Sequence, residues 1–189
     1  MKTNPQELKG NWTKGWALDM HSTAATSRAG CGFEMVRTEM GEAIFLLKYR
    51  GQIEQLEVIS DVVTEFIRAK AINPDVLIGT PPSIVRTFQP VAALASSIGK
   101  KLGVPVSTDY LVKVKDTPPA KELDSNERKL QLRDAFRIES AKYRGKTVLL
   151  FDDLFGSGDT LNAITATLFD QGGVAKVCVV TATMNRTRR

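Results

Sequence analysis

The sequence Val-Leu-Leu-Phe-Asp-Asp-Leu-Phe-Gly-Ser-Gly-Asp-Thr occupies positions 148–160. Its apolar start predicts a buried strand from Thr147 to Phe151, which brings the adjacent carboxylates of Asp152 and Asp153 to the edge of a sheet. A loop with two glycines follows, and a helix is expected from Asp159 to Gln171. A strand, an acid pair, a glycine loop and a helix in this order are typical of a ligand site beyond the carboxyl end of a strand.

Each part of this segment suits a different part of one ligand. Gly156 and Gly158 let the backbone approach a ligand closely, and the amides of residues 157–160 would lie at a helix N-terminus, where N–H groups bind anions. The carboxylates of Asp152 and Asp153 can accept hydrogen bonds from vicinal hydroxyls or hold a hydrated Mg²⁺ ion. A phosphate site a few residues from paired carboxylates matches a ribose 5-phosphate.

Other interpretations of the segment fit it less well. The Gly-x-x-x-x-Gly-Lys-Ser/Thr order of a nucleoside triphosphate loop is absent, and no Gly-x-Gly-x-x-Gly follows a strand. A plain strand end with Asp159 as a helix cap remains the structural alternative. The acid pair followed by Gly-Ser-Gly-Asp-Thr favours the ligand site.

Outward from this segment, apolar strands alternate with amphipathic helices. Helical spacing of apolar residues predicts a helix from Thr38 to Gly51 and a second from Glu54 to Lys70. Further strands are expected at 76–78, 104–114 and 177–183, helices at 90–102 and 125–133, a weak strand at 12–20, and loops at 22–30 and 115–124. This alternation predicts an α/β fold whose parallel (doubly wound) sheet is flanked by helices.

The composition agrees with one ordinary globular domain. The chain has 189 residues, 42% of them hydrophobic and 25% charged, and its net charge of +5 suits an anionic small-molecule substrate as well as nucleic acid. Its two cysteines, Cys31 and Cys178, are too few for a disulfide framework or a four-cysteine zinc site. Since no secretory signal and no apolar run of about 18 residues occur, a cytoplasmic protein without a membrane partner is expected.

The 148–160 segment resembles the phosphoribosyl pyrophosphate signature of the type I phosphoribosyltransferases. Three collinear segments resemble the ComF-like phosphoribosyltransferases in particular, a family linked to DNA uptake and processing in bacteria. They are Phe45 to Gly51, with its Lys-Tyr-x-Gly, then Arg86 to Gln89, and Glu127-Arg128 with Ala135-Phe136. The resemblance covers roughly residues 40–183, and the family's N-terminal cysteine zinc module is absent from this sequence.

The resemblance implies an N-terminal hood at residues 1–37 and a phosphoribosyltransferase-like α/β domain at residues 38–189. It implies Mg²⁺-dependent transfer of the phosphoribosyl group from phosphoribosyl pyrophosphate to a nitrogen acceptor, with release of pyrophosphate. A homodimer is also consistent with it. In this reading, phosphoribosyl pyrophosphate is bound by Asp152, Asp153, Gly156, Ser157, Gly158, Asp159 and Thr160, and its pyrophosphate by the loop Thr80, Pro81, Pro82 and Arg86.

A mobile loop with Lys113, Lys115, Lys121 and Arg128 would close over this site. Asp152, Asp153 and Arg128 would be catalytic, and the two aspartates would hold Mg²⁺ directly or through water. A strand-ending turn at the prolines and solvated loop lysines are the alternatives. Departures from the family pattern, at Thr87, Gln131 and Ala120, favour a specialised branch.

The acceptor is left open by the sequence. Gly156 stands where 6-oxopurine phosphoribosyltransferases carry a carboxylate, so that form of purine salvage is not expected. His21 could be a base or a structural histidine, and Trp12 and Trp16 could stack on a substrate or pack in the core. The alternative function is a non-catalytic binding module accessory to DNA processing. The basic tail at 186–189 leaves nucleic-acid contact open, although no stripe of aromatic and basic residues favours it.

Overall fold

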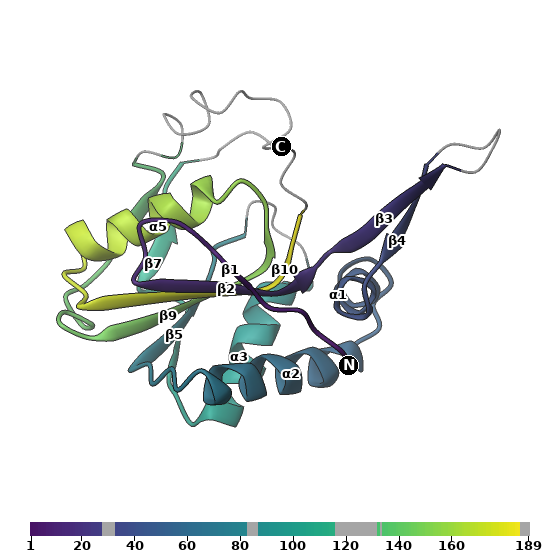
Figure 1. Ribbon diagram of the computed structural model, residues 1–189. Helices are drawn as coiled ribbons and strands as arrows, with labels where there is room; N and C mark the ends of the chain where they lie inside the picture. The colour runs from purple at the N-terminus through teal and green to yellow at the C-terminus, as the bar shows by residue number, and fades with distance from the viewer. Residues whose placement is uncertain (28–32, 83–86, 116–131, 133, 186–189) are drawn as a thin grey trace.

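A six-stranded sheet in the order β1-β2-β10-β9-β5-β6 forms the centre of the computed structural model (Figure 1). The model describes residues 1–27, 33–82, 87–115, 132 and 134–185. All neighbouring strands are parallel except β1, which pairs antiparallel with β2. The strands are β1 (Gln6–Glu7), β2 (Lys14–Met20), β5 (Val76–Gly79), β6 (Val106–Ser107), β9 (Thr147–Phe155) and β10 (Lys176–Met184).

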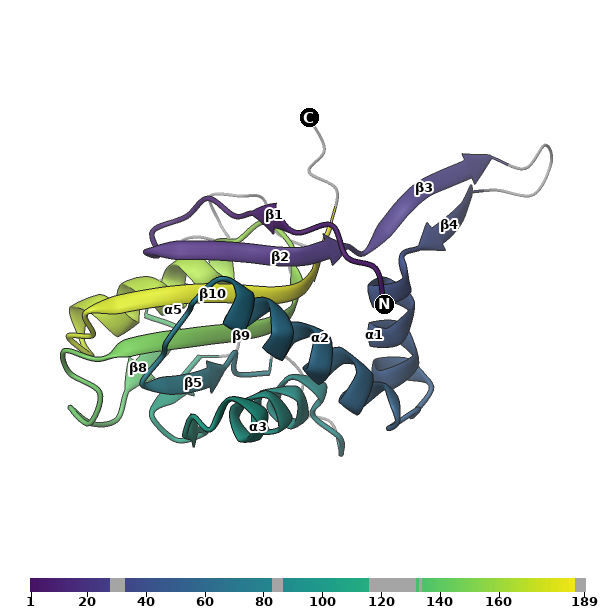
Figure 2. The same cartoon turned by 60° about the horizontal axis from the view of Figure 1, so that its bottom comes forward.

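Helices cover both faces of this sheet, which confirms the predicted α/β fold (Figure 2). On one face lie α1 (Glu39–Tyr49), α2 (Gln55–Ala69) and α3 (Pro90–Leu102), and on the other lies α5 (Asp159–Asp170). In β9, Leu149 and Phe151 enter the core under the first group, whereas Val148 and Leu150 enter the core under α5. Because both faces are covered, the strand is continuously apolar rather than alternating.

Local sequence signals account for the predicted helices. The Thr38 hydroxyl caps α1 by accepting a hydrogen bond from the Gly41 amide. Pro90 begins α3 at a position where its missing N–H costs nothing, and Gly103 ends the helix in the left-handed conformation at φ +71°. The four described helices therefore begin and end within one residue or two of the expected positions.

Two strand predictions need correction. β9 does not stop at Phe151 but continues through the acid pair to Phe155, because its ladder with β10 runs on to the pair Met184 and Phe155. The strand expected at 104–114 is divided into β6 and β7 (Leu111–Lys113). β7 leaves the central sheet and pairs with β8 (Phe136–Ile138), so that Leu111 and Phe136 join the core under α5.

The N-terminal part contains more strand than its sequence suggests. The weak signal at 12–20 corresponds to β2, which lies beside β10 in the central sheet. Residues 22–27, expected in a loop, form β3 (Ser22–Ser27), which pairs with β4 (Phe33–Arg37) in a hairpin. Figure 1 shows this hairpin projecting from the body beside α1. The division into a hood and an α/β domain stays a prediction, but β1 and β2 belong to the sheet.

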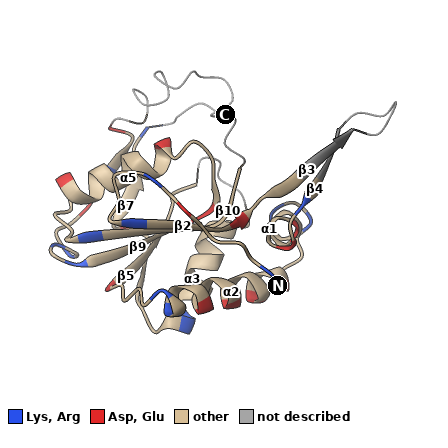
Figure 3. Cartoon of the chain, viewed as in Figure 1, with Lys and Arg blue, Asp and Glu red and all other residues tan. Residues whose placement is uncertain are grey.

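Charged side chains of both signs lie on α2 and α3. Figure 3 shows acidic residues along α2 and basic residues at the neighbouring end of α3. Among the described residues, no helix combines the length and the apolar composition needed to cross a membrane. The helix expected at 125–133 lies outside the described residues apart from Leu132, which is buried.

Candidate functional site

The acid pair lies near the carboxyl end of β9, with its two side chains on opposite faces of the strand. Asp153 alternates with Leu149 and Phe151 and so faces α1, whereas Asp152 alternates with Leu150 and faces the side of α5. Asp153 is only 5% exposed and Asp152 is partly exposed. The extension of β9 past Phe151 is what separates the two carboxylates in this way.

Asp153 is paired with a lysine from α1. The Lys48 Nζ atom lies 2.6 Å from Asp153 Oδ2, and both side chains are largely buried. The backbone carbonyl of Asp153 accepts a hydrogen bond of 3.0 Å from the hydroxyl of Thr183 on β10. Neither Lys48 nor Thr183 was among the site residues predicted from sequence, although Lys48 belongs to the Lys-Tyr-x-Gly segment that carries the resemblance.

Asp152 has partners of its own. Its Oδ1 atom accepts a hydrogen bond of 2.9 Å from the Asp153 amide, and its carboxyl group also bonds the Thr80 side chain. Burial, followed by the charge of Asp153, raises the pKa of Asp152 to about 7, against the opposing effects of Thr80, the Asp153 amide and Lys48. Although the residue is partly exposed, its carboxyl group is closely surrounded by protein.

The glycine loop between β9 and α5 has an open side and a packed side. Gly156 and Ser157 are exposed, and a Cβ atom built on Gly156 would meet nothing within 4 Å. Gly158 is buried and begins α5 at φ +83°, where a Cβ atom would lie 2.9 Å from the Phe155 ring. The open side therefore leaves room for a ligand at the N-terminus of α5, where first-turn amides lack intrahelical acceptors.

Asp159 and Thr160 form the first turn of α5. The Ser157 hydroxyl donates a hydrogen bond of 2.6 Å to Asp159 Oδ2, which braces the loop. Thr160 is exposed and lies in the first turn of α5, directly after the loop. The hydrogen bond to Asp159 holds Ser157 against the first turn of α5.

The predicted pyrophosphate loop begins beside the acid pair. Thr80 follows β5 directly, is 8% exposed, and donates its amide to the Phe151 carbonyl at 2.9 Å. Pro81 is partly exposed and Pro82 exposed. Arg86 lies outside the described residues. The structure thus brings Thr80, at the end of β5, next to Asp152, near the end of β9.

The described part of the predicted mobile loop lies on β7 and just after it. Lys113 is in β7, and exposed Lys115 lies 3.9 Å from Asp134. Within the described part of the chain, neither lysine forms an ion pair with Asp152 or Asp153. Lys121 and Arg128 lie outside the described residues.

His21 lies beside the acid pair, directly after β2. Its Nδ1 atom is 3.3 Å from the hydroxyl of Thr183, the same hydroxyl that bonds the Asp153 carbonyl. Burial and the cations Arg37 and Lys48 lower the pKa of His21, and the charge of Asp153 opposes them. The histidine is therefore held neutral near pH 7 at the edge of the candidate site.

Trp12 packs in the protein interior, and Trp16 is partly buried against the core under α2. Trp12 is buried and donates its indole N–H to the Leu8 carbonyl at 3.0 Å. Trp16 makes an edge contact with Phe66 of α2 at 6.0 Å between ring centroids. Cys178 is also buried, and burial raises the pKa of its thiol. The core interpretation of these side chains is the one that the contacts support.

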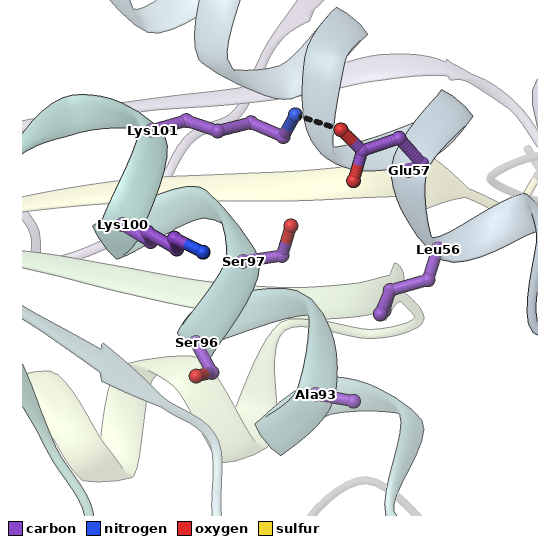
Figure 4. A pocket seen from close by; sticks show the side chains of 7 residues that line it. All are labelled: Leu56, Glu57, Ala93, Ser96, Ser97, Lys100 and Lys101. Carbon is purple, nitrogen blue, oxygen red and sulfur yellow. Dashed lines mark hydrogen bonds and ion pairs between the residues drawn. The ribbon is translucent and has the colours of Figure 1, made fainter.

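A separate open groove of about 570 Å³ lies between α2 and α3 (Figure 4). The Lys101 Nζ atom crosses it to Glu57 Oε1 at 2.5 Å. The groove is lined by Leu56, Glu57, Ala93, Ser96, Ser97, Lys100 and Lys101. None of the site residues predicted from sequence lines it.

Comparisons with known proteins agree with this geometry. Residues 50–189 match the family profile described as phosphoribosyl transferase domain. A solved glutamine phosphoribosylpyrophosphate amidotransferase from B. subtilis is similar with a TM-score of 0.51 and 18% identity, covering 79% of this chain and 34% of that chain. At this identity the likeness is one of fold.

Two further solved structures are similar at lower TM-scores. Adenine phosphoribosyltransferase from Leishmania tarentolae has a TM-score of 0.48 and 12% identity, covering 84% of this chain and 79% of that chain. UMP synthase of Leishmania donovani has a TM-score of 0.42 and 16% identity, covering 83% of this chain and 27% of that chain. The chain thus spans only 27% of the synthase and 34% of the amidotransferase. No curated protein matches this chain.

Proposed function

The chain belongs to the phosphoribosyl transferase domain family, and we propose that it binds phosphoribosyl pyrophosphate with Mg²⁺. It would then transfer the phosphoribosyl group to a nitrogen acceptor and release pyrophosphate. One observation carries the proposal. The acid pair of β9, the start of the loop after β5 and the open glycine loop before α5 all lie at the carboxyl edge of one parallel sheet. Ligands of open α/β sheets bind at this edge.

The phosphate of the ribose would bind in the glycine loop. The exposed backbone of Gly156 and Ser157 and the first turn of α5 offer N–H groups and a positive helix end to an anion. The Thr160 hydroxyl would add a donor from the same turn. Asp159 would brace the loop through Ser157 rather than touch the phosphate, since two anionic groups repel each other.

The ribose would lie across the carboxyl end of β9, where it would meet Asp152 from one face of the strand and Asp153 from the other. Each carboxylate has several lone-pair positions, so contacts with Lys48 or Thr80 leave acceptor capacity for the vicinal hydroxyls. Hard carboxylate oxygens also suit Mg²⁺, which commonly binds one or two carboxylates and completes its shell with water and substrate phosphates. No group of three metal-ligating side chains occurs among the described residues, so substrate oxygens and water would supply the remaining ligands.

The leaving pyrophosphate would bind at the loop that begins with Thr80. Negative charge develops on it as the bond to ribose C1 breaks, and bound Mg²⁺ would neutralise part of that charge. Thr80 of this loop bonds Asp152, so the residues that contact the pyrophosphate and those that contact the ribose would be linked to each other. We assign Arg86, Lys113, Lys115 and Arg128 to the same pyrophosphate as part of the proposal.

The family branch and the acceptor belong to the proposal too. The collinear segments favour a ComF-like member, and Gly156, in place of a carboxylate, favours an acceptor other than a 6-oxopurine. We also assign His21, held neutral beside the acid pair, to the acceptor as a hydrogen-bond partner. A cytoplasmic location and a homodimer stay predictions.

Calorimetric titration with phosphoribosyl pyrophosphate, with and without Mg²⁺, tests the binding step. Asp153→Asn should weaken binding about 10- to 100-fold, the loss of one or two hydrogen bonds to a charged group. Asp75→Asn is the matched control, because Asp75 accepts the Thr147 amide at 2.8 Å at the opposite end of β9. No binding by the wild type, or equal loss in both variants, would refute the proposal.

A screen of nucleobases and amines for pyrophosphate release then tests transfer. Release that requires one acceptor and is lost in Asp153→Asn supports an enzyme. Tight binding without release, together with salt-dependent affinity for single-stranded DNA, would support the non-catalytic module instead.

A further inference from the structure

The ion pair between Lys48 and Asp153 is unlike the surface pairs of this protein. The side chains are 23% and 7% exposed, and their charged atoms are 2.6 Å apart. Exposed pairs contribute little, whereas removing one partner of a buried pair leaves an uncompensated charge. Lys48 therefore acts strongly on the position of the Asp153 carboxylate.

The helix that carries Lys48 is fixed closely to the sheet. The Thr38 hydroxyl donates a hydrogen bond of 2.6 Å to the Met20 carbonyl at the end of β2. A Cβ atom on Gly41 would lie only 2.1 Å from the His21 carbonyl oxygen, so only glycine permits this approach of α1 to the strand end. Ile44 and Leu47 are buried in the core under α1. Lys48 thus extends from a scaffold with little freedom to move.

The backbone of Asp153 is also held, and independently of Lys48. Its carbonyl accepts the Thr183 hydroxyl, and Thr183 in turn contacts His21. Asp152, on the other face of β9, is held by Thr80 and by the Asp153 amide. These contacts hold the backbone of Asp153 but not its side chain. The ion pair with Lys48 is the contact that sets the direction of the Asp153 carboxylate.

We propose that Lys48 is a positioning residue, which holds one oxygen of Asp153 so that the other is presented to the ribose hydroxyls of the bound substrate. This inference rests on the proposed function. Lys48 acts through Asp153 and does not contact the ligand. It follows that the effect of removing Lys48 depends on the presence of the Asp153 carboxylate.

A double-mutant cycle with phosphoribosyl pyrophosphate and Mg²⁺ as the probe tests this dependence. Lys48→Met should weaken binding about 10- to 100-fold, the usual effect of losing a partner that orients a ligating carboxylate. In an Asp153→Asn background the same substitution should change the affinity less than about 3-fold. Lys48→Arg keeps the charge and should retain most of the affinity.

Lys101→Met is the matched control. Lys101 is 22% exposed on its side chain and pairs with Glu57 at 2.5 Å and Asp61 at 2.7 Å, away from the acid pair. The Lys101→Met variant should bind phosphoribosyl pyrophosphate and Mg²⁺ as tightly as the wild type does. An equal loss of affinity in Lys101→Met and Lys48→Met would mean that both substitutions act by destabilising the fold, and it would overturn the inference.

The remaining outcomes separate the inference from the proposed function. Wild-type affinity in Lys48→Met, with weakened binding in Asp153→Asn, would overturn the positioning role alone. Equal losses from Lys48→Met in both backgrounds would show direct contact with the ligand and also overturn it. Arginine at position 48 binding as poorly as methionine would count against it, and failure of the wild type to bind would overturn both proposals.

Discussion

Replacing Gly158 by alanine should test whether the loop before α5 requires a glycine at this position. Gly158 has φ +83°, a conformation that costs a residue with a Cβ atom roughly 1–2 kcal/mol. The new methyl group would also lie 2.9 Å and 3.0 Å from two atoms of the Phe155 ring, and such crowding typically costs about 1–3 kcal/mol. The smaller entropy of the unfolded alanine chain offsets about 0.4–1 kcal/mol.

The expected net loss in the free energy of unfolding is therefore about 1–5 kcal/mol. Gly156→Ala is the control, since Gly156 has open space around its Cβ position and no positive φ. Its stability should equal that of the wild type or exceed it by up to about 1 kcal/mol, because only the smaller entropy of the unfolded chain changes. Chemical denaturation followed by circular dichroism measures both. Equal stability of the Gly158→Ala variant and the wild type would refute the argument from backbone conformation.

Gly156→Ala, the control for stability, should nevertheless change the affinity for the ligand. The Gly156 methyl group would point into the open side of the loop, where the phosphate is proposed to bind. Gly156→Ala should therefore weaken binding of phosphoribosyl pyrophosphate without lowering stability. Unchanged affinity in this variant would mean that the ligand does not approach the loop closely at this residue.

Three further predictions concern titratable groups. Because the pKa of Asp152 is raised from 3.8 to about 7, the unfolded chain releases this proton first as the pH rises, so the residue lowers stability progressively between those two values. Asp152→Asn should reduce this decline in denaturation at pH 5 and pH 8, and an unchanged decline would contradict it. The pKa of His21 should lie below 6.5 by NMR titration and fall further in Asp153→Asn, which removes a charge that raises it; a rise would be inconsistent with their proximity. In a Cys31→Ser background, Cys178 should react with an alkylating reagent only in denaturant, because the thiol is buried, and rapid labelling of the native protein would disprove this.

Local signals made the helices predictable from the sequence. Pro90 and Gly103 mark both ends of α3 through their own backbone preferences, and Thr38 caps α1 with its own side chain. Such signals act within a few residues and need no knowledge of the fold. The parallel sheet followed in the same way, because strands buried on both faces have continuous apolar sequences.

Features that depend on distant pairing could not be read in this way. β9 extends past Phe151 only because β10 continues beside it, and the Asp-Asp dipeptide alone looks like the end of a strand. β3 consists of small polar residues and is a strand through its pairing with β4. The sequence therefore predicted both carboxylates at the edge of the sheet where the strand ends, whereas the extended strand directs them to opposite faces.

The candidate site shows the same division. The acids and the glycine loop are contiguous in sequence, so their chemistry could be inferred together. Lys48 is separated from Asp153 by 105 positions, and only the docking of α1 on the sheet brings them to 2.6 Å. A lysine beside buried Leu47 on an otherwise apolar helix face was the available signal for it.

The proposed function requires one short loop to bind the sugar phosphate while the neighbouring acids contact the sugar. NMR titration of the labelled protein with ribose 5-phosphate and then with phosphoribosyl pyrophosphate and Mg²⁺ tests it most directly. Both ligands contain the sugar and its phosphate, so both should shift the backbone amides of residues 156–160 and the side-chain carboxyl signals of Asp152 and Asp153. Shifts confined to the groove between α2 and α3, or none at all, would contradict it.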